Sequence, residues 1–212
     1  MMKDRIRRLC QKIFQTSAFL DETKEIKEGN TDRAWSAEEL NRMLALALKQ
    51  GREGYITVLY LGRYAGLRLN ECYQIDTEQA ARAIKEKTLL VKGNAGQIRS
   101  VPINAILVNR FKLHLRNAPS NGKLLPPYQC PERIKIHNFC KFILDSGLSV
   151  QLKHYDSRMT YDGLRKVCAR MWYEKKCQAG ESPAQASKEV VHLLGREQDP
   201  VVAEYLEKGE DS

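Results

Sequence analysis

The chain has 212 residues, of which 42% are hydrophobic, enough for one core-forming domain or one domain with an extension. Lysine and arginine (35) outnumber aspartate and glutamate (26), giving a net charge of +9, which favours a polyanionic partner. No apolar run approaches the roughly 20 residues of a spanning helix, and the N-terminus lacks a signal-peptide core. Nucleic acid is therefore favoured over a membrane.

Six cysteines form no Cys-x-x-Cys pair and no spacing with histidine that suits zinc. Four of them fall in predicted helices among apolar neighbours, which favours small buried thiols. We therefore expect no metal site and a reducing, cytoplasmic environment.

Residues 1–30 are expected to lie apart from the main domain. Apolar residues recur at helical spacing over residues 1–19, with basic residues between them, and residues 22–30 form a polar linker. An ordinary amphipathic helix with a solvated basic face is favoured over a dedicated DNA clamp. Residues 31–212 are expected to form the compact domain.

The first half of that domain is predicted to be helical. A capping box begins at Ser36 and opens a helix that runs to Leu48. Residues 55–64 form a further helix that ends at Gly66, and Arg68 falls in the first turn of the next one.

A β-hairpin and two helices follow. Residues 88–92 and 98–103 are β-prone and are joined by a glycine-rich turn. Residues 104–116 and 134–144 are predicted helices, separated by a proline-rich loop. In the second helix, Ile136, Phe139 and Cys140 are expected to face inward.

Three helices are predicted in the last third. Thr160 caps a helix with an apolar stripe of Leu164, Val167, Cys168, Met171 and Trp172, and Arg165 lies beside this stripe. A second capping box at Ser182 opens a helix that Gly195 closes, and Asp199-Pro200 starts a short helix that carries Tyr205. The expected architecture is mostly α-helical with one small antiparallel sheet.

Four short segments resemble, in the same order, the boxes of the tyrosine recombinases, the phage-integrase family. Residues 65–71 read Ala-Gly-Leu-Arg-Leu-Asn-Glu, residues 160–165 read Thr-Tyr-Asp-Gly-Leu-Arg, and residues 194–196 read Leu-Gly-Arg, with a tyrosine nine residues after the arginine. Residues 90–103 look like the family's lysine-bearing hairpin. The resemblance implies an α+β, mostly α-helical fold, that of the tyrosine recombinase catalytic domain.

By this resemblance Tyr205 is the nucleophile, and Arg68, Arg165 and Arg196 clamp the scissile phosphate. Lys92 is the general acid that protonates the leaving 5′ oxygen. The arginines and Lys92 would therefore also bind DNA. Three arginines and a lysine around one phosphate would favour the phenolate and neutralise the developing charge.

Each assignment has an ordinary structural alternative. By resemblance Glu71 would brace the site. Arg68 could instead be an exposed helix residue that simply forms an ion pair with Glu71 at i+3. Lys92 could be a solvated lysine at a hairpin turn.

Two positions depart from the family pattern. Asp162 stands where histidine is usual, and Arg196 stands where histidine or tryptophan is usual. Asp162 could form a salt bridge with Arg165 at i+3, and Tyr161 or Lys166 could supply the missing hydrogen-bond donor. Arg196 can still donate to a phosphate oxygen.

The resemblance implies a site-specific DNA recombinase that works through a 3′-phosphotyrosyl intermediate and needs no metal or nucleotide cofactor. Its partner would be double-stranded DNA, on which family members assemble as tetramers. Only seven residues follow Tyr205, so the free protein is expected to be monomeric. The location would be the cytoplasm of a bacterium, with a phage or another mobile element as a possible source.

Three alternatives stay open: a non-catalytic DNA-binding relative, a type IB topoisomerase with the same chemistry, and a basic helical interaction module. Family members usually carry a core-binding domain ahead of the catalytic one. We therefore expect a fragment or a short variant, with residues 1–19 as a remnant of that domain.

Overall fold

The computed structural model describes residues 33–93, 96–120, 122–146 and 159–195. The predicted N-terminal helix and linker, and the predicted helix that carries Tyr205, lie outside the described residues. The domain boundary at residue 30 and the helix around Tyr205 therefore stay predictions.

The described residues form helices and one two-stranded antiparallel sheet, as expected for an α+β, mostly helical domain. The elements in chain order are α2 (Ala37–Lys49), α3 (Glu53–Ala65), α4 (Leu69–Gln74), α5 (Thr77–Glu86), β1 (Thr88–Lys92), β2 (Ile98–Pro102), α6 (Ala105–Leu115), α7 (Glu132–Asp145), α8 (Tyr161–Gln178) and α9 (Pro183–Leu193). None of the described helices is both long and apolar enough to cross a membrane.

The helix ends follow the predicted local signals. Ser36 accepts a hydrogen bond from the backbone of Glu39 while the Glu39 side chain accepts one from the backbone of Ser36, which is the predicted capping box of α2. Ser182 caps α9 through the backbone N–H of Gln185. Helix α3 ends at Gly66, whose φ of +61° suits a residue without a Cβ.

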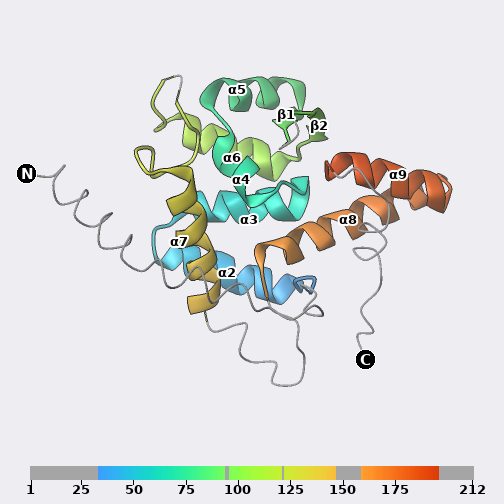
Figure 1. The fold of residues 1–212 in the computed structure, drawn as a ribbon, viewed down its shortest axis with the longest axis horizontal. Coiled ribbons are helices and arrows are strands. Elements are labelled where there is room, and N and C mark those ends of the chain that lie inside the picture. Colours follow the sequence, from blue (N-terminus) through green and yellow to red (C-terminus); the bar gives the residue numbers. More distant parts are fainter. Residues whose placement is uncertain (1–32, 94–95, 121, 147–158, 196–212) are drawn as a thin grey trace, which may run out of the picture. The chain divides into compact units, whose positions relative to one another are not determined.

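Helix α3 is the centre of the core. It is buried along most of its length and packs against α2, α6 and α8, between which it runs in Figure 1. Apolar residues from these helices and the hairpin share one large cluster. Since α3 ends at Gly66 directly before Arg68, the core fixes the position of the first predicted box.

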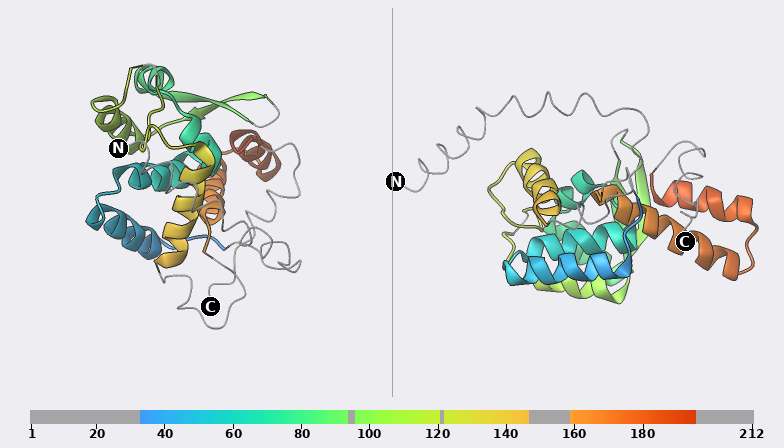
Figure 2. Two further views of the ribbon diagram at one scale, coloured as in Figure 1. Left: turned by 60° about the vertical axis from the view of Figure 1, so that its left-hand side comes forward. Right: turned by 90° about the horizontal axis from the view of Figure 1, so that it is seen from below.

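The hairpin and α9 lie side by side, as both views of Figure 2 show, and β2 packs against α9. In the antiparallel register Val91 lies opposite Arg99 and Lys92 opposite Ile98. Helix α9 also packs on α8, so the second, third and fourth predicted boxes converge at the end of α9.

Several expectations at the level of single elements were wrong. Helix α5 was not anticipated, although Asp76 and Gln79 form a capping box at its start. Met171 was assigned to an apolar stripe and Cys140 was expected to face inward, but both are exposed, as is Leu48 at the predicted end of α2. A helical stripe predicts only the direction of a side chain, and near a helix end or the edge of the domain no neighbour covers that direction.

The cysteines of the described residues also differ in how deeply they are buried. Cys72 and Cys168 are buried, and burial raises the pKa of each thiol to about 12. Cys140 is exposed, while Cys130 and Cys177 are half-buried. The expectation of buried thiols therefore holds for two cysteines of the described part of the chain.

Candidate active site

Arg68 lies at the junction between α3 and α4. It is the N-cap of α4 and not, as predicted, part of the first turn. Its backbone N–H donates to Glu71 Oε2 at 2.7 Å, and its Nη2 donates to the carbonyl of Gly195 at 2.9 Å. The guanidinium also lies 3.8 Å from Glu71 Oε1, so the i+3 pairing with Glu71 is present, though long.

Arg165 lies one turn after the start of α8 and reaches the same place from the other side. Its Nε donates to the carbonyl of Gly66 at 2.9 Å, and its Nη2 donates to that of Leu194 at 3.1 Å. Its Nη1 donates to Asp162 Oδ1 at 3.2 Å, which confirms the predicted i+3 ion pair. The Arg165 side chain is 2% exposed.

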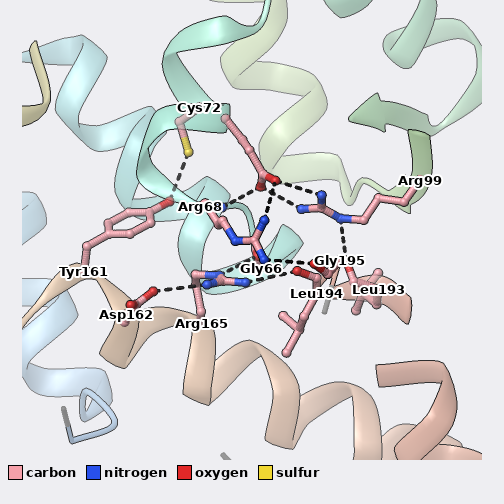
Figure 3. Close-up of polar contacts among 11 residues, drawn as sticks. Gly66, Arg68, Cys72, Arg99, Tyr161, Asp162, Arg165, Leu193, Leu194 and Gly195 are labelled. Carbon is pink, nitrogen blue, oxygen red and sulfur yellow. Dashed lines mark hydrogen bonds and ion pairs between the residues drawn. The ribbon is translucent and has the colours of Figure 1, made fainter. Parts of the chain in front are cut away.

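A third arginine, Arg99 of β2, completes the group. Its two terminal nitrogens bind the two carboxylate oxygens of Glu71 at 2.8 and 2.7 Å. Its Nε donates to the carbonyl of Leu193 at 2.9 Å. Figure 3 shows that Arg68, Arg99 and Arg165 converge on the end of α9. We call these three arginines with Glu71 the arginine cluster.

The arginine cluster caps the C-terminus of α9. Three consecutive carbonyls, of Leu193, Leu194 and Gly195, accept hydrogen bonds from three different arginines. Helix C-termini leave carbonyls without intrahelical partners and carry partial negative charge, so cations are stabilising there. The end of α9 therefore holds three guanidinia together that would otherwise repel each other.

The glycine that ends α9 is required by both its backbone and its surroundings. Gly195 has a φ of +62°, and a Cβ placed on it would lie 2.7 Å from Nη1 of Arg99. The Arg99 guanidinium thus passes directly over the Gly195 backbone, and this close approach fixes the chain just before Arg196.

The arginine cluster is suited to an anion. Guanidinium groups bind phosphate oxygens in planar, bidentate geometry, and a phosphate charge would be stabilised by the three cations. Arg68 is the accessible member, with 28% of its side chain exposed. Among the described residues, no group of three or more His, Cys, Asp or Glu side chains could hold a metal ion.

Lys92 belongs to the hairpin but does not share a strand face with Arg99. It is exposed at the end of β1, and the alternation of the strand places it on the face opposite to Val91 and Arg99. Arg196 and Tyr205 lie outside the described residues, so their positions stay predictions.

The candidates to replace the missing histidine differ in their surroundings. Tyr161 is buried, and its hydroxyl lies 3.3 Å from the Val58 carbonyl and 3.0 Å from Cys72 Sγ. Burial raises the pKa of Tyr161 well above its usual value. Tyr161 is therefore part of the core; Lys166 is also buried, and Asp162 is half-exposed.

Arg99 was not among the predicted site residues, although the sequence carried a signal for it. Within Ile98–Pro102, residues 99 and 101 share one face, and Val101 is buried. Strand alternation thus placed an arginine on the core-facing side, where a charged group needs a charged or hydrogen-bonding partner. An inward-pointing arginine beside a box that contains Glu71 was the available hint.

Comparisons with known proteins agree with this arrangement only at the level of structure. No protein-family model matches the sequence, and no curated protein matches it. Among solved structures, the XerA recombinase has 16% identity and a TM-score of 0.61, covering 85% of this chain and 62% of its own. A lambda integrase dimer bound to a COC′ core site has 14% identity and a TM-score of 0.63, covering 99% of this chain and 57% of its own.

A further similar structure is the XerH site-specific recombinase bound to palindromic difH substrate, a post-cleavage complex. It has 17% identity and a TM-score of 0.55, and the match covers 88% of this chain and 52% of that one. The chain thus spans only about half to three-fifths of the length of these relatives. At such identities the likeness shows the fold: the chain has the fold of the tyrosine recombinase catalytic domain, as the order of the boxes predicted.

Proposed function

We propose that this protein is a site-specific DNA recombinase that breaks and rejoins DNA through a 3′-phosphotyrosyl intermediate. The observation that supports this most strongly is the meeting of Arg68 and Arg165, which come from separate boxes. Their guanidinia bind the neighbouring carbonyls of Gly195 and Leu194, directly before Arg196. The same fold is found in solved recombinases.

In the proposed reaction, the Tyr205 oxygen attacks a DNA phosphorus atom and the bond from phosphorus to the 5′ oxygen breaks. Lys92 gives a proton to that leaving oxygen, so that a 5′ hydroxyl is released. Arg68, Arg165 and Arg196 stabilise the charge on the phosphate, which is the main task of fixed cations in such a site. A hydroxyl of a partner strand then reverses the step and releases Tyr205.

The proposed partner is double-stranded DNA, bound in the cytoplasm. The net charge of +9 supports an interaction with a polyanion. Self-association into a tetramer on DNA belongs to the same proposal, because rejoining to a partner strand requires two duplexes in one complex.

One observation favours a second candidate, a DNA-binding protein without cleavage activity. Asp162 binds a terminal nitrogen of Arg165, whose side chain is otherwise held by backbone carbonyls and buried. A carboxylate at this position repels a phosphate. This candidate predicts salt-dependent DNA binding, since phosphate contacts release counterions, with no covalent product.

A nicked suicide duplex distinguishes the two candidates. Substrates are taken from the DNA that flanks the gene, and a covalent adduct is sought on a denaturing gel. A recombinase gives an adduct that disappears in Tyr205→Phe and persists in Tyr128→Phe, a half-buried tyrosine in the loop before α7. Binding by the wild type without an adduct supports the second candidate, and cleavage by Tyr205→Phe contradicts the assignment of the nucleophile.

A further inference from the structure

We propose that Arg99 is a positioning residue, which acts through Glu71 and the end of α9 to hold the catalytic groups in place. This inference rests on the proposed function. Arg99 does not meet the substrate in this role, because its side chain is only 4% exposed and all three of its guanidinium nitrogens already donate to Glu71 or Leu193. It is the one member of the arginine cluster that bonds to both Glu71 and α9 from the hairpin.

The first link runs from Arg99 to Arg68. Arg99 binds both oxygens of Glu71, and Glu71 Oε2 accepts the backbone N–H of Arg68 at 2.7 Å. The Glu71 carboxylate is buried, so Arg99 is the charge that keeps it in this orientation. With Arg99 in place, the Arg68 guanidinium stays 3.8 Å from Glu71 and points to Gly195, where a phosphate can be bound.

The second link runs from Arg99 to the corner that precedes Arg196. Arg99 Nε holds the carbonyl of Leu193, and the same guanidinium lies directly over the backbone of Gly195. Two residues of the corner, Leu193 and Gly195, are thus contacted by one side chain. Arg99 therefore holds the described residues that lead into Arg196.

The third link is through the sheet. Arg99 lies opposite Val91, and Lys92 is the next residue of β1. A strand anchored at Arg99 by three side-chain hydrogen bonds fixes the register and position of the hairpin that carries Lys92. Arg99 thus connects Arg68, Arg196 and Lys92, three groups far apart in sequence.

Lysine cannot replace arginine in this position. The ammonium group is a point charge, whereas the guanidinium here makes a bidentate bond to Glu71 and a third bond, from Nε, to Leu193. Arg99→Lys keeps the charge that Glu71 needs, but releases α9. A misplacement of about 1 Å in a catalytic group can cost on the order of 10²-fold in rate.

The test compares Arg99→Lys with Arg110→Lys, a matched control elsewhere in the domain. Arg110 of α6 also donates three side-chain hydrogen bonds, to Thr57 Oγ1 at 3.0 Å and to the carbonyl and carboxylate of Glu53 at 2.8 and 2.6 Å. We measure adduct formation on the suicide duplex, DNA affinity and melting temperature. Arg99→Lys is expected to form adduct about 10²-fold more slowly with unchanged DNA affinity, while Arg110→Lys keeps the wild-type rate.

A double variant separates positioning from stability. Arg99→Met alone leaves the buried Glu71 charge unpaired and is expected to lower the melting temperature by roughly 10 °C. In Arg99→Met/Glu71→Gln the charge is gone and the amide oxygen can still accept the Arg68 N–H, so the melting temperature recovers. Adduct formation stays below that of Glu71→Gln alone if Arg99 positions the site, whereas recovery of both together would show a purely structural role.

Failure of this inference differs from failure of the proposed function. Wild-type rates in Arg99→Lys, with the wild type active, overturn the positioning role and leave the recombinase standing. A wild type that binds DNA without any adduct overturns both.

Discussion

Two clusters of hydrogen-bonded polar side chains in the domain make similar bonds but differ in their balance of charge. The arginine cluster lies at the end of α9, and a second group, which we call the His114 cluster (Glu53, Thr57, Arg110 and His114), joins α3 to α6. In the His114 cluster one arginine faces one carboxylate, and His114 Nε2 lies 2.7 Å from Thr57 Oγ1. Its charges are balanced within the protein.

The arginine cluster is not balanced in this way. Three guanidinia meet the single carboxylate of Glu71, with Asp162 added at the edge, and backbone carbonyls take the remaining donors described above. Carbonyl groups carry only partial negative charge, so a bound anion would stabilise the arginine cluster. The same anion would disturb the balanced charges of the His114 cluster. This difference in charge balance indicates that the His114 cluster stabilises the fold, whereas the arginine cluster is suited to binding phosphate.

The largest expected effect tests this separation directly. Arg68→Ala is expected to reduce adduct formation by about 10³-fold, because a fixed cation that stabilises developing charge is lost. Arg110→Ala is expected to lower the free energy of unfolding by about 2 kcal/mol, chiefly because the buried Thr57 loses a partner while the half-exposed Glu53 can be solvated, with normal cleavage per folded molecule. Gel assays and urea denaturation measure the two quantities, and equal loss of cleavage in both variants would erase the distinction.

A smaller effect is expected at the corner that Arg99 covers. Gly195→Ala adds a Cβ at positive φ, 2.7 Å from a guanidinium held by three bonds, and is expected to cost about 3 kcal/mol of folding stability. Gly51→Ala is the control, because Gly51 has a φ of +64° with open space around it, and should cost only about 1 kcal/mol. Equal melting temperatures of Gly195→Ala and Gly51→Ala would show that the Arg99 side chain moves to make room for the added methyl group.

The His114 cluster has its own pH dependence. Burial, and secondarily the charge of Arg110, lowers the pKa of His114 from 6.5 to about 4. Between these values the unfolded chain binds a proton that the folded one does not, so stability falls as pH falls. From pH 7 to pH 5 the loss is about 2 kcal/mol, measured by urea denaturation and absent in His114→Gln. The same loss in His114→Gln would assign it to other groups.

The smallest effect is expected at Asp162. Its side chain is 48% exposed, so its ion pair with Arg165 is weak. Asp162→Asn removes a charge that repels phosphate and is expected to accelerate adduct formation about fivefold. Asp145→Asn, at the end of α7, serves as a control for net charge. Slower cleavage in Asp162→Asn would instead assign the carboxylate an orienting role on Arg165.

Much of the fold could be predicted because its signals are local. Capping residues such as Ser36, Ser182 and Gly66 act on the backbone within one turn, and the hairpin follows from its β-prone runs and glycine-rich turn. Helix α5 was missed despite the same kind of cap at Asp76. The boundaries of the other described elements follow the prediction to within a few residues.

The sequence by itself determined the order of the boxes, and with it the choice of Arg68, Lys92, Arg165, Arg196 and Tyr205. The tertiary structure decided how the described side chains are used: Tyr161 in the core, Lys92 on the outer face of the hairpin, and Arg99 in the centre of the cluster. The contacts of Arg99 with Glu71 and Leu193 span 28 and 94 residues, and that of Arg68 with Gly195 spans 127. Such contacts depend on how helices and strands pack, which local periodicity and capping do not encode.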